Sequence, residues 1–231
     1  MERRKFISRL ALAFAALSLR PPVGTQLVEQ RSQWKFGEFE NLLHHPARIK
    51  QMFEETKMEA GGFLNNIKNS LNGLQFGFGV PAQEIKIVAA LHGPPNMLNY
   101  DDYVWNKYKI GEWLKVDDPA TGKPAIRNPF YASKAGKDLH YTSTDPNSSD
   151  SMYQDTSIQG LQARGVQFLS CHTATEEQAR KLVKEQHLTQ PPEEIVRDMI
   201  AHLLPHVLQV AAMGAAVALL QSQGHYTYTT V

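Results

Sequence analysis

Two short stretches of the sequence, residues 84–91 and 166–171, are almost continuously apolar and end abruptly. The first runs into the breaker sequence Gly93-Pro94-Pro95, and the second ends at Cys171, just before a helical pattern. Strands that read this way are buried on both faces, because helices cover both sides of a parallel sheet. These stretches therefore predict two core strands of a parallel sheet, which restricts the chain to an α/β fold.

The rest of the chain supplies the partners that such strands need. Apolar residues recur every three or four positions in several segments, as in helices that bury one face. We expect further strands at 48–53, 207–210 and 225–229, and helices at 60–75, 100–114, 175–184, 193–204 and 211–223. Alternating strands and helices predict a three-layer α/β/α sandwich around a mostly parallel sheet of about five strands. A single domain over residues 48–231 accommodates all of these elements.

The first twenty residues have the pattern of an export signal. Arg3-Arg4 precedes Lys5-Phe6-Ile7, and residues 10–19 form a short apolar run before Arg20. A basic segment ahead of a short apolar one is typical of signal peptides, and the paired arginines resemble a twin-arginine (Tat) signal. An ordinary amphipathic first helix is the alternative, although residues 10–19 have no polar face. We therefore expect residues 1–20 to be a twin-arginine signal and the protein to be periplasmic.

The charge of the chain argues against several classes of partner. The whole chain has 24 basic and 23 acidic residues and a net charge of +1. Residues 1–20 hold five of the basic residues and one acidic residue, so the remainder has 19 basic and 22 acidic residues and a net charge of −3. A mildly acidic protein is a poor binder of nucleic acids and of anionic membranes. We predict no nucleic-acid partner and no membrane association of the mature form, since no apolar run approaches the roughly 20 residues of a membrane helix.

Two segments fall outside the regular pattern. Residues 21–47 are polar and contain proline breakers, so we expect an irregular leader arm that packs on the domain. Residues 96–157 form a long insert that contains six of the eight tyrosines and two of the three tryptophans. Long loops of this kind are often lids or binding segments. The alternative is an insert that packs on the sheet edge or on another subunit.

Three further signatures occur in a fixed order along the chain. Residues 85–88 lead into His92-Gly93-Pro94, residues 165–171 end in a cysteine, and residues 219–228 join a helix end to a short strand. In this order they resemble DsrE/DsrF-like proteins, over residues 48–95 and 158–229. The resemblance implies a compact α/β/α fold that assembles into homo-oligomers, and a cysteine persulfide that carries sulfur in some relatives. The long insert departs from the short connection that is usual in the family.

The predicted sheet brings three chemically active side chains to one edge. The carboxyl ends of parallel strands meet at the same edge, and ligands usually bind there. His92, Cys171 and His172 follow or end the two core strands and therefore belong to this rim. Cys171 stands just before a helix, whose amino terminus favours a thiolate over a thiol. A thiolate at this place has the chemistry of a sulfur acceptor.

The single cysteine narrows the chemistry further, because it excludes an internal disulfide and any multi-cysteine zinc or iron–sulfur site. We expect Cys171 to accept sulfur as a persulfide, with His92 and His172 as electrostatic support and a sulfur donor or acceptor protein as partner. Alternatively, Cys171 fills space at a strand end and the protein is a non-catalytic small-ligand or protein-binding module. A metal site formed by the same three residues is a third hypothesis, but their spacing is not that of structural zinc. We predict neither a metal nor a cofactor.

Overall fold

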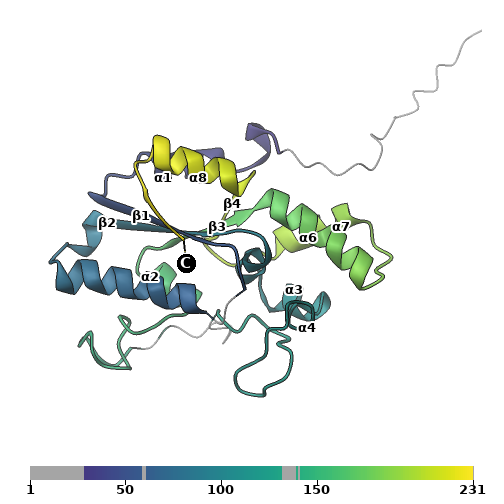
Figure 1. Ribbon diagram of the computed structural model, residues 1–231, viewed down its shortest axis with the longest axis horizontal. Coiled ribbons are helices and arrows are strands. Elements are labelled where there is room, and N and C mark those ends of the chain that lie inside the picture. The colour runs from purple at the N-terminus through teal and green to yellow at the C-terminus, as the bar shows by residue number, and fades with distance from the viewer. Residues whose placement is uncertain (1–28, 59–60, 132–138, 140, 231) are drawn as a thin grey trace, which may run out of the picture.

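The computed structural model describes residues 29–58, 61–131, 139 and 141–230. The predicted signal at 1–20 and the beginning of the leader arm lie outside the described residues. A five-stranded sheet forms the middle layer (Figure 1), with strands β1 (Ile49–Glu55), β2 (Ile85–Leu91), β3 (Gln167–Cys171), β4 (Leu208–Val210) and β5 (Thr227–Thr230). All neighbouring strands run parallel, in the order β4-β3-β2-β1-β5. The α/β class and the parallel five-stranded sheet are therefore confirmed.

Helices cover both faces of the sheet, so the fold has three layers (Figure 1). One face carries α1 (Phe36–Leu43) and α8 (Met213–Ser222). The other carries α2 (Gly62–Asn72), α6 (His172–Glu185) and α7 (Pro192–Ala201), with the shorter helices α3 (Asp102–Lys107), α4 (Ile110–Leu114) and α5 (Ile158–Ala163). Turns of 3-10 helix at Arg31–Gln33, Ala82–Glu84 and Pro94–Asn99 and a π-helical turn at Gly73–Gly77 complete the described elements. None of the helices in the described ranges has the length and apolar character required to cross a membrane.

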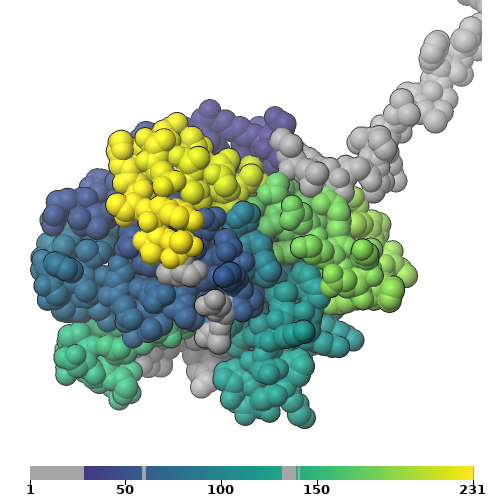
Figure 2. All heavy atoms as spheres, viewed as in Figure 1, coloured from purple at the N-terminus to yellow at the C-terminus, as the bar shows by residue number. Residues whose placement is uncertain are grey.

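Strand β2 is buried on both faces, as its apolar sequence predicts. Ile87 and Ala89 belong to a core cluster shared with α2, α3, α6 and α7, whereas Val88 and Ala90 belong to a second cluster beneath α1 and α8. Successive side chains of a strand point to opposite faces, so one apolar run serves both cores. The two clusters hold the sheet between its helical layers. On the face seen in the space-filling view, the described segments lie against one another (Figure 2).

The leader arm is not irregular throughout, because residues 36–43 form α1. Phe39, Leu42 and Leu43 are at most 5% exposed, and α1 packs against β4 and α8. Their spacing of three and four residues gives the helix one apolar face, which is buried against the sheet and α8. The expectation of an irregular segment is therefore wrong, whereas the packing of the described part of the arm on the domain is confirmed.

The aromatic insert contributes directly to the core of the protein. Tyr100, Trp105 and Tyr108 are at most 1% exposed and lie in the cluster on the α2, α6 and α7 side of the sheet. The helix predicted at 100–114 is broken into α3 and α4 at Lys109, whose φ of 47° is left-handed. These three aromatic side chains pack within their own chain, so they are not available to grip a ligand or a second subunit.

Candidate functional site at the strand-end rim

The structure places the predicted rim residues at one edge of the sheet. Leu91 of β2 pairs with Ser170 of β3, so His92 and Cys171 come next at the same edge. Their side chains nevertheless belong to separate groups of contacts. The ring of His92 is 42% exposed, and its Nδ1 lies 3.2 Å from Glu54 Oε1. Within the described part of the chain, no hydrogen bond joins His92 to Cys171.

Cys171 is the N-cap residue of α6, which begins three residues before its predicted start. Its Sγ accepts a hydrogen bond from the Ala174 N–H, at 3.4 Å, and a second from the Met213 N–H, at 3.2 Å. Met213 is the first residue of α8. The Sγ atom also lies 3.1 Å from Thr173 Oγ1. The amino termini of two helices, one from each layer, therefore converge on one sulfur atom.

This convergence presents partial positive charge to the sulfur. The first amides of a helix have no carbonyl partner within the helix, and the helix dipole adds to their effect. Both features favour a thiolate. The side chain of Cys171 is 0% exposed and lies among the apolar residues beneath α1 and α8, where burial opposes a charge. Half-buried residues flank it, namely Thr173, Ala211 and Ala212, so solvent is only a short distance from the sulfur.

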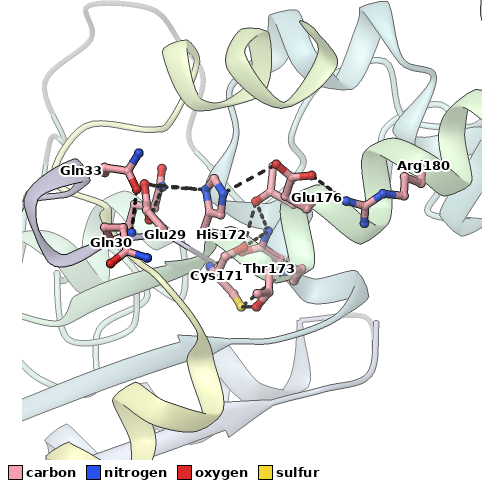
Figure 3. Close-up of polar contacts among 12 residues, drawn as sticks. Glu29, Gln30, Gln33, Cys171, His172, Thr173, Glu176 and Arg180 are labelled. Atoms are coloured by element: carbon pink, nitrogen blue, oxygen red, sulfur yellow. Dashed lines mark hydrogen bonds and ion pairs between the residues drawn. The ribbon is translucent and has the colours of Figure 1, made fainter. Parts of the chain in front are cut away.

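His172 points away from the sulfur, as Figure 3 shows. Its ring lies between two carboxylates, with Nδ1 3.8 Å from Glu29 Oε1 and Nε2 3.7 Å from Glu176 Oε1. Gln209 Nε2 lies 3.1 Å from the same Nδ1 and donates to the Glu29 carboxylate. Arg180 binds the second oxygen of Glu176 at 2.8 Å. The imidazole thus links the leader arm to the first turn of α6 and does not contact the thiol.

A buried polar network supports the start of α6 from beneath. Asn96 Oδ1 accepts hydrogen bonds from the Cys171 N–H at 2.9 Å and from Ser170 Oγ at 3.0 Å. Asn96 Nδ2 donates to Thr175 Oγ1 at 3.0 Å, and the Tyr100 hydroxyl lies 2.6 Å from the same oxygen. All five residues are at most 1% exposed. The first turn of the insert therefore fixes the backbone of the cysteine.

Burial shifts two ionisable groups of this region. Desolvation raises the pKa of the Glu176 carboxyl, and the charges of His172 and Arg180 partly offset that increase. Desolvation also raises the pKa of the Tyr100 hydroxyl, so this group is a neutral member of the network. The rim thus combines a desolvated carboxyl, whose pKa is raised, with a sulfur that accepts hydrogen bonds from two backbone amides.

Sequence reasoning missed Asn96 and Tyr100 as supports of the site. The signal that identifies Asn96 is a polar residue between the apolar residues Pro95 and Met97 of a short turn. A polar residue in such a place is buried only if its hydrogen bonds are satisfied. Its partners Ser170, Cys171 and Thr175 lie 74 or more residues away in the sequence, so no local pattern predicts these contacts.

The described residues offer little to a metal ion. Among them, no group of three or more His, Cys, Asp and Glu side chains is arranged to hold one. Comparisons of the chain with protein-family models, with curated proteins and with solved structures give no match.

Proposed function

We propose that the protein is an exported sulfur-handling protein in which Cys171 accepts sulfane sulfur as a persulfide. The observation that carries this proposal is the convergence of α6 and α8 on Sγ. A thiolate is the nucleophile of sulfur exchange, and amide donors stabilise negative charge on sulfur both before and after it is loaded. The DsrE/DsrF-like resemblance supports the same role, since it places a cysteine at the end of this strand.

The proposed step exchanges one sulfur–sulfur bond for another. The Cys171 thiolate attacks the outer sulfur of a donor persulfide, R–S–SH. The new Sγ–S bond forms as the donor's S–S bond breaks, and the donor leaves as a thiolate with the bonding electron pair. The products are the Cys171 persulfide, which keeps the proton of the outer sulfur, and R–S⁻. No external oxidant or reductant takes part, because the sulfane sulfur is only passed on, and the reverse step delivers it to an acceptor protein.

Transfer requires a donor to reach a thiol that is 0% exposed. The first turn of α8 is the part of the cover that we propose moves aside. It contains Gly214 and Ala215, which are exposed and have almost no side chain to anchor the turn. Glycine also lowers the stability of a helical turn. Displacing this turn exposes Sγ beside the half-buried Thr173 and moves the Met213 N–H away from the sulfur. The Ala174 N–H of α6 remains the donor to Sγ while the turn is open.

Sulfur loading of the purified protein tests this proposal. After exposure to inorganic polysulfide and removal of the excess, intact-mass analysis should find one added sulfur atom per chain. The Cys171→Ser variant should show none. Thr173→Val removes the hydroxyl that lies beside Sγ and keeps the side-chain shape, so it should load more slowly. A wild-type protein that remains unmodified while it stays folded would overturn the proposal.

Export and assembly belong to the same proposal. Arg3 and Arg4 precede the apolar run at 10–19, and the DsrE/DsrF-like resemblance implies a homo-oligomer. Cell fractionation should find the wild-type protein in the periplasm and an Arg3→Lys/Arg4→Lys variant in the cytoplasm. Equal distribution of the two proteins would contradict twin-arginine export.

The assembly of the protein is tested separately. Size-exclusion chromatography with light scattering should give a mass above that of one chain, and a single-chain mass would contradict assembly.

One observation favours a second candidate function. Cys171 is completely buried, which is typical of a structural cysteine, so a non-catalytic periplasmic binding module is the alternative. The polysulfide experiment separates the two, because only the sulfur-handling function requires the thiol.

A further inference from the structure

A small cavity lies at the opposite edge of the sheet from Cys171. Ile85, the first residue of β2, contributes to its wall, so the cavity lies at the amino ends of the strands. Its volume is about 210 Å³, and its lining is mostly apolar, with Leu71, Ala82, Met152 and Ala163 beside Ile85. The polar members of the lining are Gln75, Tyr153 and Arg164.

In the part of the chain that the structure describes, the Arg164 guanidinium has no carboxylate partner. Both terminal nitrogens of its guanidinium are buried, and neither has a hydrogen-bond partner within the described residues. By contrast, Arg48, Arg127 and Arg180 each bind a carboxylate, at 2.7, 3.3 and 2.8 Å. Burial lowers the pKa of the Arg164 guanidinium from its ordinary value, but such a group stays charged in proteins. Buried guanidinium nitrogens that have no acceptor among the described residues favour the binding of an anion.

An aromatic wall runs from this cation to the surface. The ring of Tyr153 covers the guanidinium, with 5.2 Å between the ring centroid and Cζ of Arg164. Phe76 meets Tyr153 edge to face, at 4.8 Å between centroids, and is 45% exposed. Asn72 Nδ2 donates to the Tyr153 carbonyl at 2.8 Å, which fixes the backbone of this wall.

We propose that this cavity binds a small organic monoanion, a carboxylate on a short apolar chain, with the carboxylate on Arg164 and the chain against the apolar wall. The planar guanidinium matches the two oxygens of a carboxylate. One charge suffices, because Arg164 is the single basic side chain among the described residues that line the cavity. The chain is short, because the volume lies below the roughly 300–1,000 Å³ of sites for drug-sized ligands. The Tyr153 ring turns aside when the carboxylate reaches the covered nitrogens.

Calorimetric titration of the full-length protein tests the proposal with three probes. Sodium hexanoate has both the charge and the chain, hexan-1-ol has only the chain, and sodium acetate has only the charge. Hexanoate should bind saturably at one site, and the other two probes should bind at least tenfold more weakly. Arg164→Gln should remove the preference for hexanoate over hexan-1-ol. Arg127→Gln, an exposed arginine that pairs with Asp118, is the matched control and should bind hexanoate as the wild type does.

A second measurement guards against a purely structural role of Arg164. Replacing an unpaired buried charge with an unbranched apolar chain removes a desolvation cost, so Arg164→Met should melt at a higher temperature than the wild type without ligand. Hexanoate should raise the melting temperature of the wild type and leave that of Arg164→Met unchanged. Equal binding of hexanoate and hexan-1-ol, no binding of hexanoate, or undiminished binding by Arg164→Gln would each overturn the proposal. Cys171→Ser should bind hexanoate normally, so this outcome is independent of sulfur handling.

Discussion

A cysteine is an uncommon residue at the start of a helix, because Ser, Thr, Asp and Asn are the side chains that cap helix amides well. In this protein the larger and softer sulfur serves two helices at once. The Cys171 Sγ accepts the Ala174 N–H of α6 and the Met213 N–H of α8. A serine oxygen, on a shorter bond, has less reach for two donors that belong to different layers. The sulfur therefore has a structural task whether or not it also performs chemistry.

The structural task of Cys171 predicts a ranking of variants. Cys171→Val keeps a similar volume but leaves two buried amides without an acceptor, so we expect it to lower the free energy of unfolding by about 2 kcal/mol. Cys171→Ser keeps an acceptor and should lose less than about 1 kcal/mol. Urea unfolding followed by circular dichroism measures both. A valine variant at least as stable as the serine variant would show that the sulfur does not cap these helices.

Glu176 gives the cluster around His172 a defined pH dependence. Its pKa in the folded protein is raised above the ordinary value of 4.5, mainly by burial. A carboxyl whose pKa is raised by folding contributes stability at pH values below its unfolded pKa, and this contribution is lost as the pH rises through the folded pKa. The wild type should therefore lose stability relative to Glu176→Gln between about pH 4 and about pH 7.

Denaturant unfolding at the two pH values measures this difference for Glu176. The neighbouring Glu177 is exposed, so Glu177→Gln is the matched control and should follow the wild type at both pH values. If Glu176→Gln and Glu177→Gln change in parallel with pH, the carboxyl of Glu176 is not held in a desolvated site.

At the scale of elements, the junction between β3 and α6 organises the site. Three independent contacts hold it: the Asn96 amide below, the α8 amino terminus on one side, and the leader arm through Glu29 and His172 on the other. Each contact comes from a segment distant in sequence. The junction is consequently the place where the insert, the arm and the carboxyl-terminal helix meet.

Asn96 is the contact whose loss should cost most. Asn96→Leu leaves the Cys171 N–H, the Ser170 hydroxyl and the Thr175 hydroxyl with fewer partners in a dry environment. Unpaired buried groups of this kind predict a loss of about 3 kcal/mol in the free energy of unfolding. Asn147→Leu, an exposed loop asparagine, is the control and should change stability by less than about 0.5 kcal/mol. Similar losses for the two variants would contradict the role of the network.

The elements differ in how well the sequence predicts them, for physical reasons. The strands at β2 and β3 are evident because burial on both faces demands an apolar residue at nearly every position. Helix α1 is missed because eight residues with three core contacts make a weak pattern within a polar segment. The start of α6 is missed because cysteine is not among the preferred cap residues, whereas the threonines that follow are. Capping propensities describe local preferences only. Cys171 caps α6 here because its Sγ also accepts a hydrogen bond from α8, which lies on the other face of the sheet.

For the site residues too, the sequence predicts some features and not others: it predicts their place on the sheet but not their contacts. That His92 and Cys171 share an edge follows from the parallel sheet, and the structure agrees. Their contacts do not follow from sequence spacing, because Glu54 and Glu29 reach the two histidines from distant segments. The opposite directions of Cys171 and His172 agree with the alternation of side chains along a strand, which reaches its end at this point. No local sequence pattern distinguishes Arg164 from the other arginines. Only the folded structure shows that its terminal nitrogens are buried without a hydrogen-bond partner among the described residues.

At the scale of the whole molecule, the insert contributes side chains to the larger of the two core clusters, the one on the α2, α6 and α7 side of the sheet. Trp105 is 0% exposed, and its Nε1 donates to the Met97 carbonyl at 3.0 Å. Trp105→Ala should lower the free energy of unfolding by about 3–5 kcal/mol, because it leaves a large cavity. Trp113, only partly buried, is the control, and Trp113→Ala should cost less than half as much. Equal and small losses, measured by urea unfolding, would mark the insert as decoration that the core does not need.

The central claim is that Cys171 reacts as a thiolate through local opening at the α8 amino terminus. The rate at which iodoacetamide alkylates the native protein, measured against low concentrations of urea, tests it most directly. Local opening exposes little surface, so the rate should stay nearly constant below the unfolding transition. A rate that rises with urea in parallel with global unfolding would contradict the claim and leave the sulfur as a buried helix cap.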